Sequence, residues 1–569
     1  MNEQRQQAYL NLIQSLLNCP SGEEAGILAV NQELLDAGFV QTVEAVAQMF
    51  SQQGDEKIAN WLRNLAMQLG EGLNLDTKVD LQSLSEEERQ AYFQFLGEVL
   101  QATANSNGDT QVVYPLLAEN TDKLDGVLAE ILRRWVTEAL REEEADLAKY
   151  VAGTILHFSN LIAQFPLGDK GSNLEIAITG YEVVLKVYTR EAFPQDWAGT
   201  QNNLAAAYSN RIKGDKAENI ENAIAAYTAA LTVRTREALP VDWAMTQNNL
   251  ANTYTGRIKG DKAENIENAI AAYTAALTVR TREALPIDWA MTQNNLAIAY
   301  RERIKGDKAE NIENAIAACN AALTVRTREA FPIDWAGTQN SLANAYRYRI
   351  KGDKAENIEN AIAAFAAALT VFTRDALPQY WAATQYGFAN AYSNRIKGDK
   401  AENIENAIAA YTAALTVRTR EALPTDWAAT QYGLANAYSD RIKGDRAENV
   451  ENAIASYTAA LTVYTRETLP IDWARTQNNL AAAYRERIRG DKAENIENAI
   501  AAYTAALTVR TKDALPIDWA RTQNNLAAAY IDRIKGDKAE NIEHAIAAFA
   551  AALTVFTRDA LPQYWAATQ

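Results

Sequence analysis

The sequence predicts an all-α solenoid made of stacked helical hairpins. The first observation behind this prediction is a unit of 46 residues that occurs eight times in a row without insertion or deletion. The second is the helical spacing of the apolar residues inside each unit. Self-similarity at a fixed period of 20–50 residues is the signature of a solenoid. Tryptophan marks the period at Trp197, Trp243, Trp289, Trp335, Trp381, Trp427, Trp473, Trp519 and Trp565.

Each unit is predicted to contain two helices and two stops, and the second copy shows them most clearly. Asp242 can cap a first helix that starts at the tryptophan and runs to about Lys259. Gly260 is expected to adopt the left-handed conformation that follows helix ends. Asp261 begins a D-x-x-E pattern close to a capping box, which predicts the start of the second helix. Pro286 is expected to end that helix, because proline disfavours the helical conformation in the residue before it.

The apolar residues of both predicted helices form stripes at helical spacing. The first helix has Leu250, Ala251, Tyr254 and Ile258, and the second has Ile266, Ala269, Ile270, Tyr273, Ala276, Leu277 and Val279. Alanine dominates both stripes, and small side chains let helix axes approach closely. One hairpin cannot cover such a face alone, so neighbouring hairpins must stack on it.

These residues resemble the tetratricopeptide repeat (TPR), whose pattern is W-x2-L-G-x2-Y…A-x3-F…P. The slots of that pattern are taken here by Leu250, Ala251, Tyr254, Ala269, Tyr273 and Pro286. Gln247 holds the tryptophan slot, and the unit is longer than the usual 34 residues, as in the kinesin light chain type. The resemblance implies a right-handed α-α superhelix whose first helices line a concave groove. It also points to large bacterial proteins in which such arrays often precede a CHAT domain, a caspase-like protease.

Composition and charge exclude several classes of function. The net charge of the chain is −17, and residues 1–150 hold 25 acidic and 10 basic side chains. The repeats are close to neutral and have no basic stripe, so nucleic-acid binding is not expected. No run of about 18 apolar residues predicts a membrane span. The two cysteines, Cys19 and Cys319, cannot form a disulfide framework or a zinc cluster, which fits a reducing cytoplasm.

Four segments are predicted along the chain. Residues 1–142 are an acidic all-helical domain, residues 143–196 a degenerate capping repeat, residues 197–564 the eight repeats, and residues 565–569 the start of a ninth. Because residues 545–569 are identical to residues 361–385, the repeats continue unchanged to the last residue. The chain is therefore expected to be truncated or to be a segment of a longer protein.

Comparison of the eight units places most of their variation on the first helix. The variable slots lie two residues after the tryptophan, two residues after the leucine, and in the pair after the tyrosine, which is one stripe of a helix. The resemblance to TPR proteins implies that this stripe faces the groove. The predicted peptide-binding residues on and beside it are Asn203, Asn249, Asn295, Asn479, Asn525, Asn252, Asn344, Tyr386, Asn390, Tyr432 and Asn436.

The asparagine before the leucine gives the sharpest hypothesis. This slot resembles the asparagine ladder of O-linked N-acetylglucosamine transferase, which holds the backbone of an extended peptide. A carboxamide offers a donor and an acceptor to a peptide unit without reading its side chains. The ladder is interrupted at Ser341, Gly387 and Gly433, which predicts an aromatic, open centre beside Tyr386 and Tyr432. The alternative is that the asparagines satisfy contacts between helices or repeats.

The remaining features favour structural roles. The repeated tryptophan is expected to pack between repeats, and Cys319 to be a buried packing residue. His544 replaces an asparagine and is expected at the surface. The turn KGDKAEN lacks the residue patterns of calcium and phosphate loops. The sequence therefore predicts no catalytic residue, no metal site and no cofactor.

The leading hypothesis is a cytoplasmic, non-enzymatic scaffold that binds an extended peptide or partner segment in the groove of the superhelix. The alternative is the sensor arm of a longer CHAT caspase-like protease whose catalytic domain lies outside these residues. A weaker hypothesis is self-association through the uncapped C-terminal repeat, whose exposed face would match an ordinary repeat.

Overall fold

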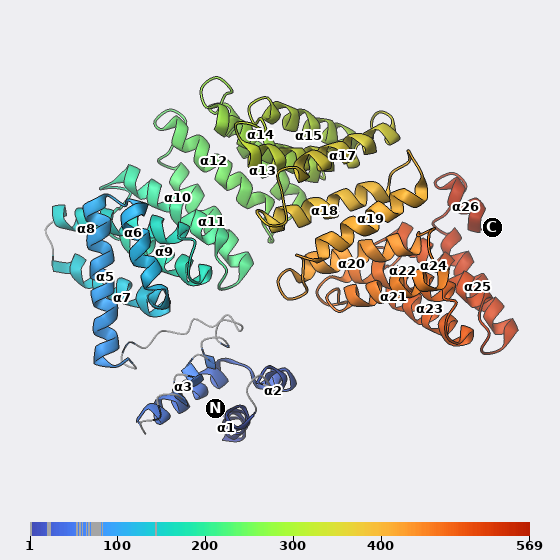
Figure 1. Cartoon of the computed structure of the whole chain (residues 1–569), viewed down its shortest axis with the longest axis horizontal. Helices are drawn as coiled ribbons and strands as arrows, with labels where there is room; N and C mark the ends of the chain where they lie inside the picture. The colour runs from blue at the N-terminus through green and yellow to red at the C-terminus, as the bar shows by residue number, and fades with distance from the viewer. Residues whose placement is uncertain are drawn as a thin grey trace. The chain divides into compact units, whose positions relative to one another are not determined.

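The computed structural model confirms the all-α fold. It describes residues 3–19, 24–52, 84–142 and 145–568, with scattered positions between 55 and 81, and every regular element in these residues is a helix (Figure 1). The chain divides into two compact parts. The first is Met1–Ala299 with Arg303–Lys305, and the second is Tyr300–Glu302 with Gly306–Gln569. A helix start predicted at Ser21 and the final Gln569 lie outside the described residues.

The first part begins with helices that are not repeats. They are α1 (Glu3–Asn18), α2 (Glu24–Val30), α3 (Ala37–Gln52), α5 (Glu86–Ser106), α6 (Thr110–Glu119) and α7 (Gly126–Glu142), with short 3-10 turns at Gln32–Leu34 and Thr121–Lys123. Tyr9 and Phe39 belong to a small core formed by α1, α3 and residues up to Leu69. A second, larger core starts at Leu81 and continues to Ala207, so α5–α7 pack with the first repeats.

The helix pairs expected from the sequence follow. The degenerate repeat consists of α8 (Ala145–Gln164) and α9 (Lys170–Val184). In the first part, the repeats contribute α10 (Pro194–Asn210), α11 (Lys216–Leu231), α12 (Pro240–Thr255), α13 (Lys262–Leu277) and α14 (Pro286–Glu302). In the second part they contribute α15 (Lys308–Leu323), α16 (Pro332–Arg347), α17 (Lys354–Leu369), α18 (Pro378–Ser393), α19 (Lys400–Leu415), α20 (Pro424–Ser439), α21 (Arg446–Leu461), α22 (Pro470–Glu486), α23 (Lys492–Leu507), α24 (Pro516–Ile531), α25 (Lys538–Leu553) and α26 (Pro562–Thr568).

The role expected for the proline is wrong. Pro240 is the first residue of α12 instead of the stop of the preceding helix, and Asp242 lies inside the first turn instead of capping it. Proline is favoured at this position because its missing N–H has no partner there in any case and its fixed φ suits a helix. The second helix of the next pair ends at Leu277, well before Pro286. The residues between them form a turn in which the Ala284 N–H donates to the Thr281 hydroxyl at 3.1 Å.

The turn between the two helices of a hairpin agrees with its prediction. Gly260 has a φ of +79°, the left-handed conformation that glycine adopts without steric cost. Asp261 caps α13, because its carboxylate accepts the Glu264 N–H at 2.8 Å. The first helix ends at Thr255, a few residues earlier than expected. These turn geometries recur from one repeat to the next, so each hairpin closes in the same way.

Alanine and aromatic side chains form the core of the stacked hairpins. In the second part, one cluster contains residues from three successive helices: Ala389 of α18, Ala407 and Tyr411 of α19, and Leu434 of α20. The tryptophans pack between repeats as predicted. Trp335 and Trp381, which belong to consecutive repeats, both contact the cluster around the buried Phe372. Burial of such aromatic rings dominates the energetics of a core of this kind.

An arginine near the end of each first helix ties its hairpin to the preceding one. Just after α20, the Arg441 guanidinium donates two parallel hydrogen bonds to the Glu405 carboxylate of α19, both at 2.8 Å. It also donates to the Asn449 side chain at 3.3 Å, and Asn449 in turn donates to the Lys443 carbonyl at 2.9 Å. Two-pronged bonds of this kind fix geometry as well as adding energy. The same pairs are Arg211–Glu175, Arg257–Glu221, Arg303–Glu267, Arg349–Glu313, Arg395–Glu359, Arg441–Glu405, Arg487–Glu451 and Arg533–Glu497.

Removal of one carboxylate from this series should destabilise the array. We expect Glu405→Ala to lower the free energy of unfolding by about 1–3 kcal/mol, because it leaves a half-buried charged donor without its acceptor. Urea unfolding followed by circular dichroism measures the effect. Glu421→Ala, at an exposed position of the following turn, is the control and should change little. Equal losses in the two variants would contradict a specific role for the pair.

The same pairs predict how stability depends on pH. Hydrogen bonds from arginine hold the pKa values of Glu221, Glu267, Glu313, Glu359, Glu405, Glu451 and Glu497 below the ordinary value. A group whose pKa is lower in the folded state stabilises the fold above its unfolded pKa and loses that contribution as the pH falls. We therefore expect the melting temperature to fall steeply below about pH 4. Glu405→Gln should show a shallower fall, and parallel curves for the two proteins would contradict the prediction.

Candidate functional site

The predicted peptide-binding residues all lie on first helices, and most of them are half-buried. In the first part, the amides are bonded across repeats. Asn203 donates to the Asn160 side chain at 2.9 Å, and Asn295 donates to the Asn252 side chain at 3.1 Å. Asn252 also accepts the Tyr273 hydroxyl at 2.5 Å. The Asn249 side-chain oxygen accepts from the side-chain amide of Asn248, its neighbour in sequence, at 3.4 Å.

A similar network is present in the second part. Asn479 donates to the Asn436 side chain and to the Tyr432 hydroxyl, both at 3.0 Å. Asn436 also accepts the Tyr457 hydroxyl at 2.7 Å. The longest of these bonds runs from Asn525 to the Asn478 side chain, at 3.4 Å. These amides therefore already form hydrogen bonds between repeats, which is what the structural interpretation of the asparagines predicts. A bound peptide would have to use the donors and acceptors that these bonds leave over.

Two further predicted residues bond to their own helix. Asn344 donates to the Asn340 carbonyl at 2.9 Å, and Asn390 donates to the Tyr386 carbonyl at 2.8 Å. In both cases the donor is the side-chain amide and the acceptor lies four residues earlier. The side-chain oxygens of these two residues are consequently the parts of the amides that remain for another partner.

The two tyrosines that interrupt the ladder are packed against arginine and tyrosine. The Arg418 guanidinium lies 4.9 Å from the centre of the Tyr386 ring, and the Arg475 guanidinium 4.6 Å from that of Tyr432. A cation above an aromatic face is attracted by the ring. Tyr386 also contacts the Tyr411 ring, with the ring centres 5.9 Å apart. The tyrosines thus present an aromatic surface that is held in place by neighbouring repeats.

The expectation of an open centre is wrong at the glycines. Gly387 and Gly433 are buried. A Cβ atom on Gly433 would lie 2.6 Å from the Tyr411 ring, and one on Gly387 would lie 2.6 Å from the Phe365 ring. Each glycine therefore lets an aromatic ring of the preceding second helix lie directly against the first-helix backbone. The space that the missing side chain leaves is filled from inside the array, which the sequence alone did not reveal.

Sequence reasoning did not distinguish the two residues of the Asn-Asn pair. The first of them is a buried structural residue in three repeats. Asn202 accepts the Thr246 hydroxyl of the next repeat at 3.1 Å, and the buried Arg234 donates to the same hydroxyl at 3.1 Å. The slot of Arg234 offered a signal in the sequence, because it changes to Phe372, Tyr464 and Phe556 in repeats four, six and eight.

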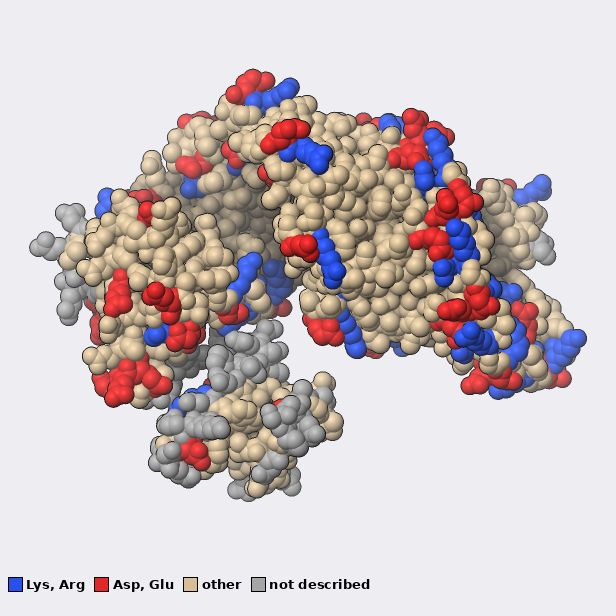
Figure 2. All heavy atoms as spheres, viewed as in Figure 1, with Lys and Arg blue, Asp and Glu red and all other residues tan. Residues whose placement is uncertain are grey.

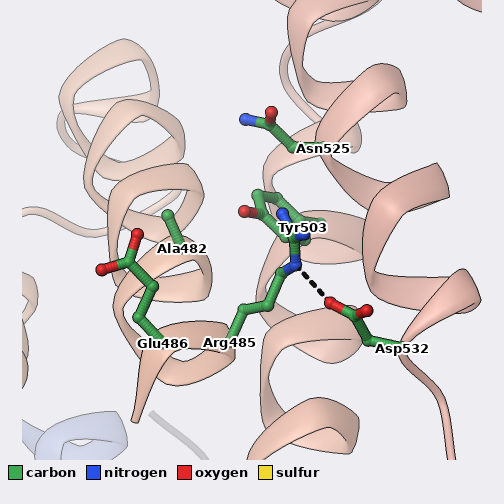
Figure 3. Close-up of a pocket in the computed structure, with 6 residues that line it drawn as sticks. All are labelled: Ala482, Arg485, Glu486, Tyr503, Asn525 and Asp532. Carbon is green, nitrogen blue, oxygen red and sulfur yellow. Dashed lines mark hydrogen bonds and ion pairs between the residues drawn. The ribbon is translucent and has the colours of Figure 1, made fainter.

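A cavity of about 390 Å³ opens on the variable stripe near the end of the second part (Figure 3). It lies between α22, α23 and α24. Its lining residues are Ala482, Arg485, Glu486, Tyr503, Asn525 and Asp532. Five of these six occupy the slots that vary between repeats or the ladder slot, and Tyr503 belongs to the second helix. Here the predicted stripe borders a hollow of the size that ligand sites have.

Charges on the described surface occur mainly in pairs of opposite sign. Arg485 and Asp532, which both line the cavity, are joined by a bond of 2.6 Å. Figure 2 shows acidic and basic side chains next to each other, with a broad uncharged area in the region of α18 and α19. On the repeats, such pairing leaves little of the concentrated field that steers highly charged ligands.

Chemistry-bearing side chains take structural positions. Cys319 is buried as predicted, and burial raises its pKa to about 12, so its thiol does not form the reactive thiolate near neutral pH. His544 is exposed and stacks on Tyr530 with the ring centres 5.0 Å apart. The described residues contain no group of three or more His, Cys, Asp or Glu side chains that could hold a metal ion. None of the described helices is long and apolar enough to cross a membrane.

The glycine interpretation can be tested by adding one methyl group. We expect Gly433→Ala to destabilise the array by about 1–3 kcal/mol, because the new Cβ would overlap the buried Tyr411 ring. Gly337→Ala is a matched control on another first helix, where a Cβ would meet no atom within 4 Å. It should stabilise by about 0.5–1 kcal/mol through helix propensity. Thermal unfolding of both variants decides the point, and a stabilising Gly433→Ala would refute the packing role.

Comparisons with known proteins yield structural neighbours only. No protein-family model and no curated protein matches the chain. Among solved structures, the chain is similar to a signal transduction ATPase with numerous domains (STAND) that has a tetratricopeptide repeat sensor, from Pyrococcus horikoshii. That match has 13% identity and a TM-score of 0.48, and it covers 93% of this chain and 74% of the other. The Cut9–Hcn1 hetero-tetramer of APC/C matches with 14% identity and a TM-score of 0.33, and the match covers 75% of this chain and 93% of the other. The TPR domain of P58(IPK) matches with 12% identity and a TM-score of 0.22, and the match covers 74% of this chain and 97% of the other.

Proposed function

We propose that this chain is a non-enzymatic, cytoplasmic scaffold that binds an extended polypeptide segment along the variable stripe of its first helices. The single observation that carries this proposal is the cavity between α22, α23 and α24, because residues of the variable slots line it. Slots that change while the packing residues stay constant are where a repeat protein can alter its partner. Under this proposal, residues 1–142 are an acidic N-terminal domain, whose helices α5–α7 share a core with the capping repeat at residues 143–196.

The proposed binding residues combine carboxamides with aromatic rings. They are Asn203, Asn249, Asn295, Asn479, Asn525, Asn252, Asn344, Tyr386, Asn390, Tyr432 and Asn436. An amide that already makes one bond to a neighbouring repeat is held in one orientation, and its second lone pair or N–H is still available. Such a preorganised amide costs little conformational entropy when a peptide binds. The inter-repeat bonds described above are therefore compatible with a role in binding.

The proposal is tested by a pulldown from the native cytoplasm with the full chain. One variant changes Asn203, Asn249, Asn295, Asn479 and Asn525 to Ala. If the ladder binds the partner, the proteins captured by the wild type should be lost from this variant. The melting curve and helicity of the variant must be measured as well, because several of these amides bond to neighbouring repeats.

A matched control changes five exposed asparagines of the second helices to alanine. These are Asn222, Asn268, Asn314, Asn360 and Asn406. This variant should capture the same proteins as the wild type. If the ladder variant is stably folded and still captures them, the partner binds elsewhere and the groove proposal fails.

The finer alternatives rest on the sequence resemblance. If the chain is the sensor arm of a CHAT protease, the reading frame beyond Gln569 should encode a His…Cys pair on an α/β pattern. Self-association through the last repeat would raise the mass measured by light scattering as the protein concentration increases.

A further inference from the structure

A tyrosine at one slot of the second helices is buried in most repeats, and its hydroxyl needs a partner. In three hairpins this partner is an asparagine of the preceding first helix, 21 residues earlier. Tyr181 donates to Asn160 at 2.8 Å, Tyr273 to Asn252 at 2.5 Å, and Tyr457 to Asn436 at 2.7 Å. A buried hydroxyl without a hydrogen bond would cost about 1–3 kcal/mol.

Tyr503 occupies the same slot and lacks this partner. The residue 21 positions earlier is Ala482, and a methyl group cannot accept a hydrogen bond. At Tyr411, a serine near the end of the first helix, Ser393, forms a side-chain hydrogen bond with the tyrosine hydroxyl instead. The equivalent position beside Tyr503 is Arg485. Tyr503 is 1% exposed, and no residue in the described part of the chain forms a hydrogen bond with its hydroxyl.

The unpartnered hydroxyl points into the cavity between α22, α23 and α24. Figure 3 shows the Tyr503 oxygen directed towards Ala482, with Asn525 above it and Arg485 below. The cavity has a volume of about 390 Å³, and Ala482 lines it at the slot where four other repeats have asparagine. We call this space the Tyr503 pocket. It combines a half-open hollow with a hydroxyl that lines it and to which no described residue bonds.

The charges that line the Tyr503 pocket cancel in two pairs. Arg485 bonds to Asp532 at 2.6 Å, and Glu486 is bonded to Arg446 of the preceding repeat. A charged guest would bring one uncompensated charge next to these two pairs and would lose part of its hydration shell on entering. A purely apolar guest would cover the Tyr503 hydroxyl without bonding to it. The pocket therefore favours a neutral guest that both donates and accepts hydrogen bonds.

We propose that the Tyr503 pocket binds the carboxamide side chain of a glutamine or asparagine in a partner polypeptide. The guest oxygen accepts from the Tyr503 hydroxyl, and its NH2 group donates to the free oxygens of Asp532 or Glu486. A carboxamide has one acceptor and two donor hydrogens, which matches this set. In effect, the guest supplies the amide that Asn252 and Asn436 supply in other repeats. The inference rests on the proposed scaffold function and adds a preference for one class of side chain.

The test uses small probes, so that it does not depend on the unknown partner. Saturation-transfer NMR titrations of the full chain compare N-acetylglutamine N-methylamide with the corresponding glutamate and leucine compounds. We expect the glutamine probe to bind at least about fivefold more tightly than the other two, the value of one hydrogen bond. Tyr503→Phe should weaken the glutamine probe about fivefold. Phenylalanine is native at this slot in Phe365 and Phe549, so this variant should fold.

A second variant fills the pocket with the residue that other repeats use. Ala482→Asn places an amide beside Tyr503 as Asn436 is placed beside Tyr457, and it should abolish binding of the glutamine probe. Ala501→Asn makes the same change on the exposed face of α23 and should leave binding unaltered. Equal binding of the three probes, tighter binding of the glutamate probe, or undiminished binding to Ala482→Asn would each overturn the proposal.

These outcomes separate the pocket from the scaffold function. If the glutamine probe fails while the ladder variant still loses its captured proteins, the groove binds partners and the Tyr503 pocket is not specific for carboxamides. The opposite result is also informative. If the probe binds, Ala482→Asn blocks it and the ladder variant captures the same proteins as the wild type, the Tyr503 pocket binds carboxamides but the asparagine ladder does not bind the partner.

Discussion

The interface between consecutive hairpins is the constraint on which the rest of this structure depends. A single hairpin has an alanine-rich face and no core of its own, so it is stable only when another hairpin covers that face. Within each compact part, the Arg–Glu pairs align each hairpin on the preceding one. They join residues 36 positions apart in the sequence. Burial of apolar area is non-directional. The two-pronged bond therefore supplies the direction that packing alone does not.

This interface explains why the repeat length is constant. An insertion between Glu405 and Arg441 would displace the guanidinium from the carboxylate and would break both of the charged hydrogen bonds that join them. It would also move the following tryptophan out of the cluster that it shares with its neighbours, as Trp335 and Trp381 do around Phe372. The polar and apolar contacts thus require the same spacing, which is typical of a sequence whose local and global preferences agree.

The surface of the first helices shows how small changes alter a repeated scaffold. Gly433 in place of asparagine admits a ring from the second helix and closes the space. Ala482 in place of asparagine leaves space and an unbonded hydroxyl. Both substitutions shorten a side chain, and they have opposite results, because a neighbouring aromatic can reach the first position and not the second. The array can therefore hold a closed aromatic surface and a polar pocket on the same backbone design.

The amino-acid sequence by itself determined the fold class, the hairpin turns and the burial of Cys319, because these depend on periodicity and on local residue chemistry. Gly260 and Asp261 behave as their types predict in almost any hairpin. The helix starts were predictable only in part, since proline can stop one helix or begin the next, and the choice depends on the turn before it. Only the tertiary structure decided which amides are bonded between repeats and which hydroxyl is not. Those bonds join residues that lie one repeat apart or on different helices, and their geometry exists only once the hairpins have stacked.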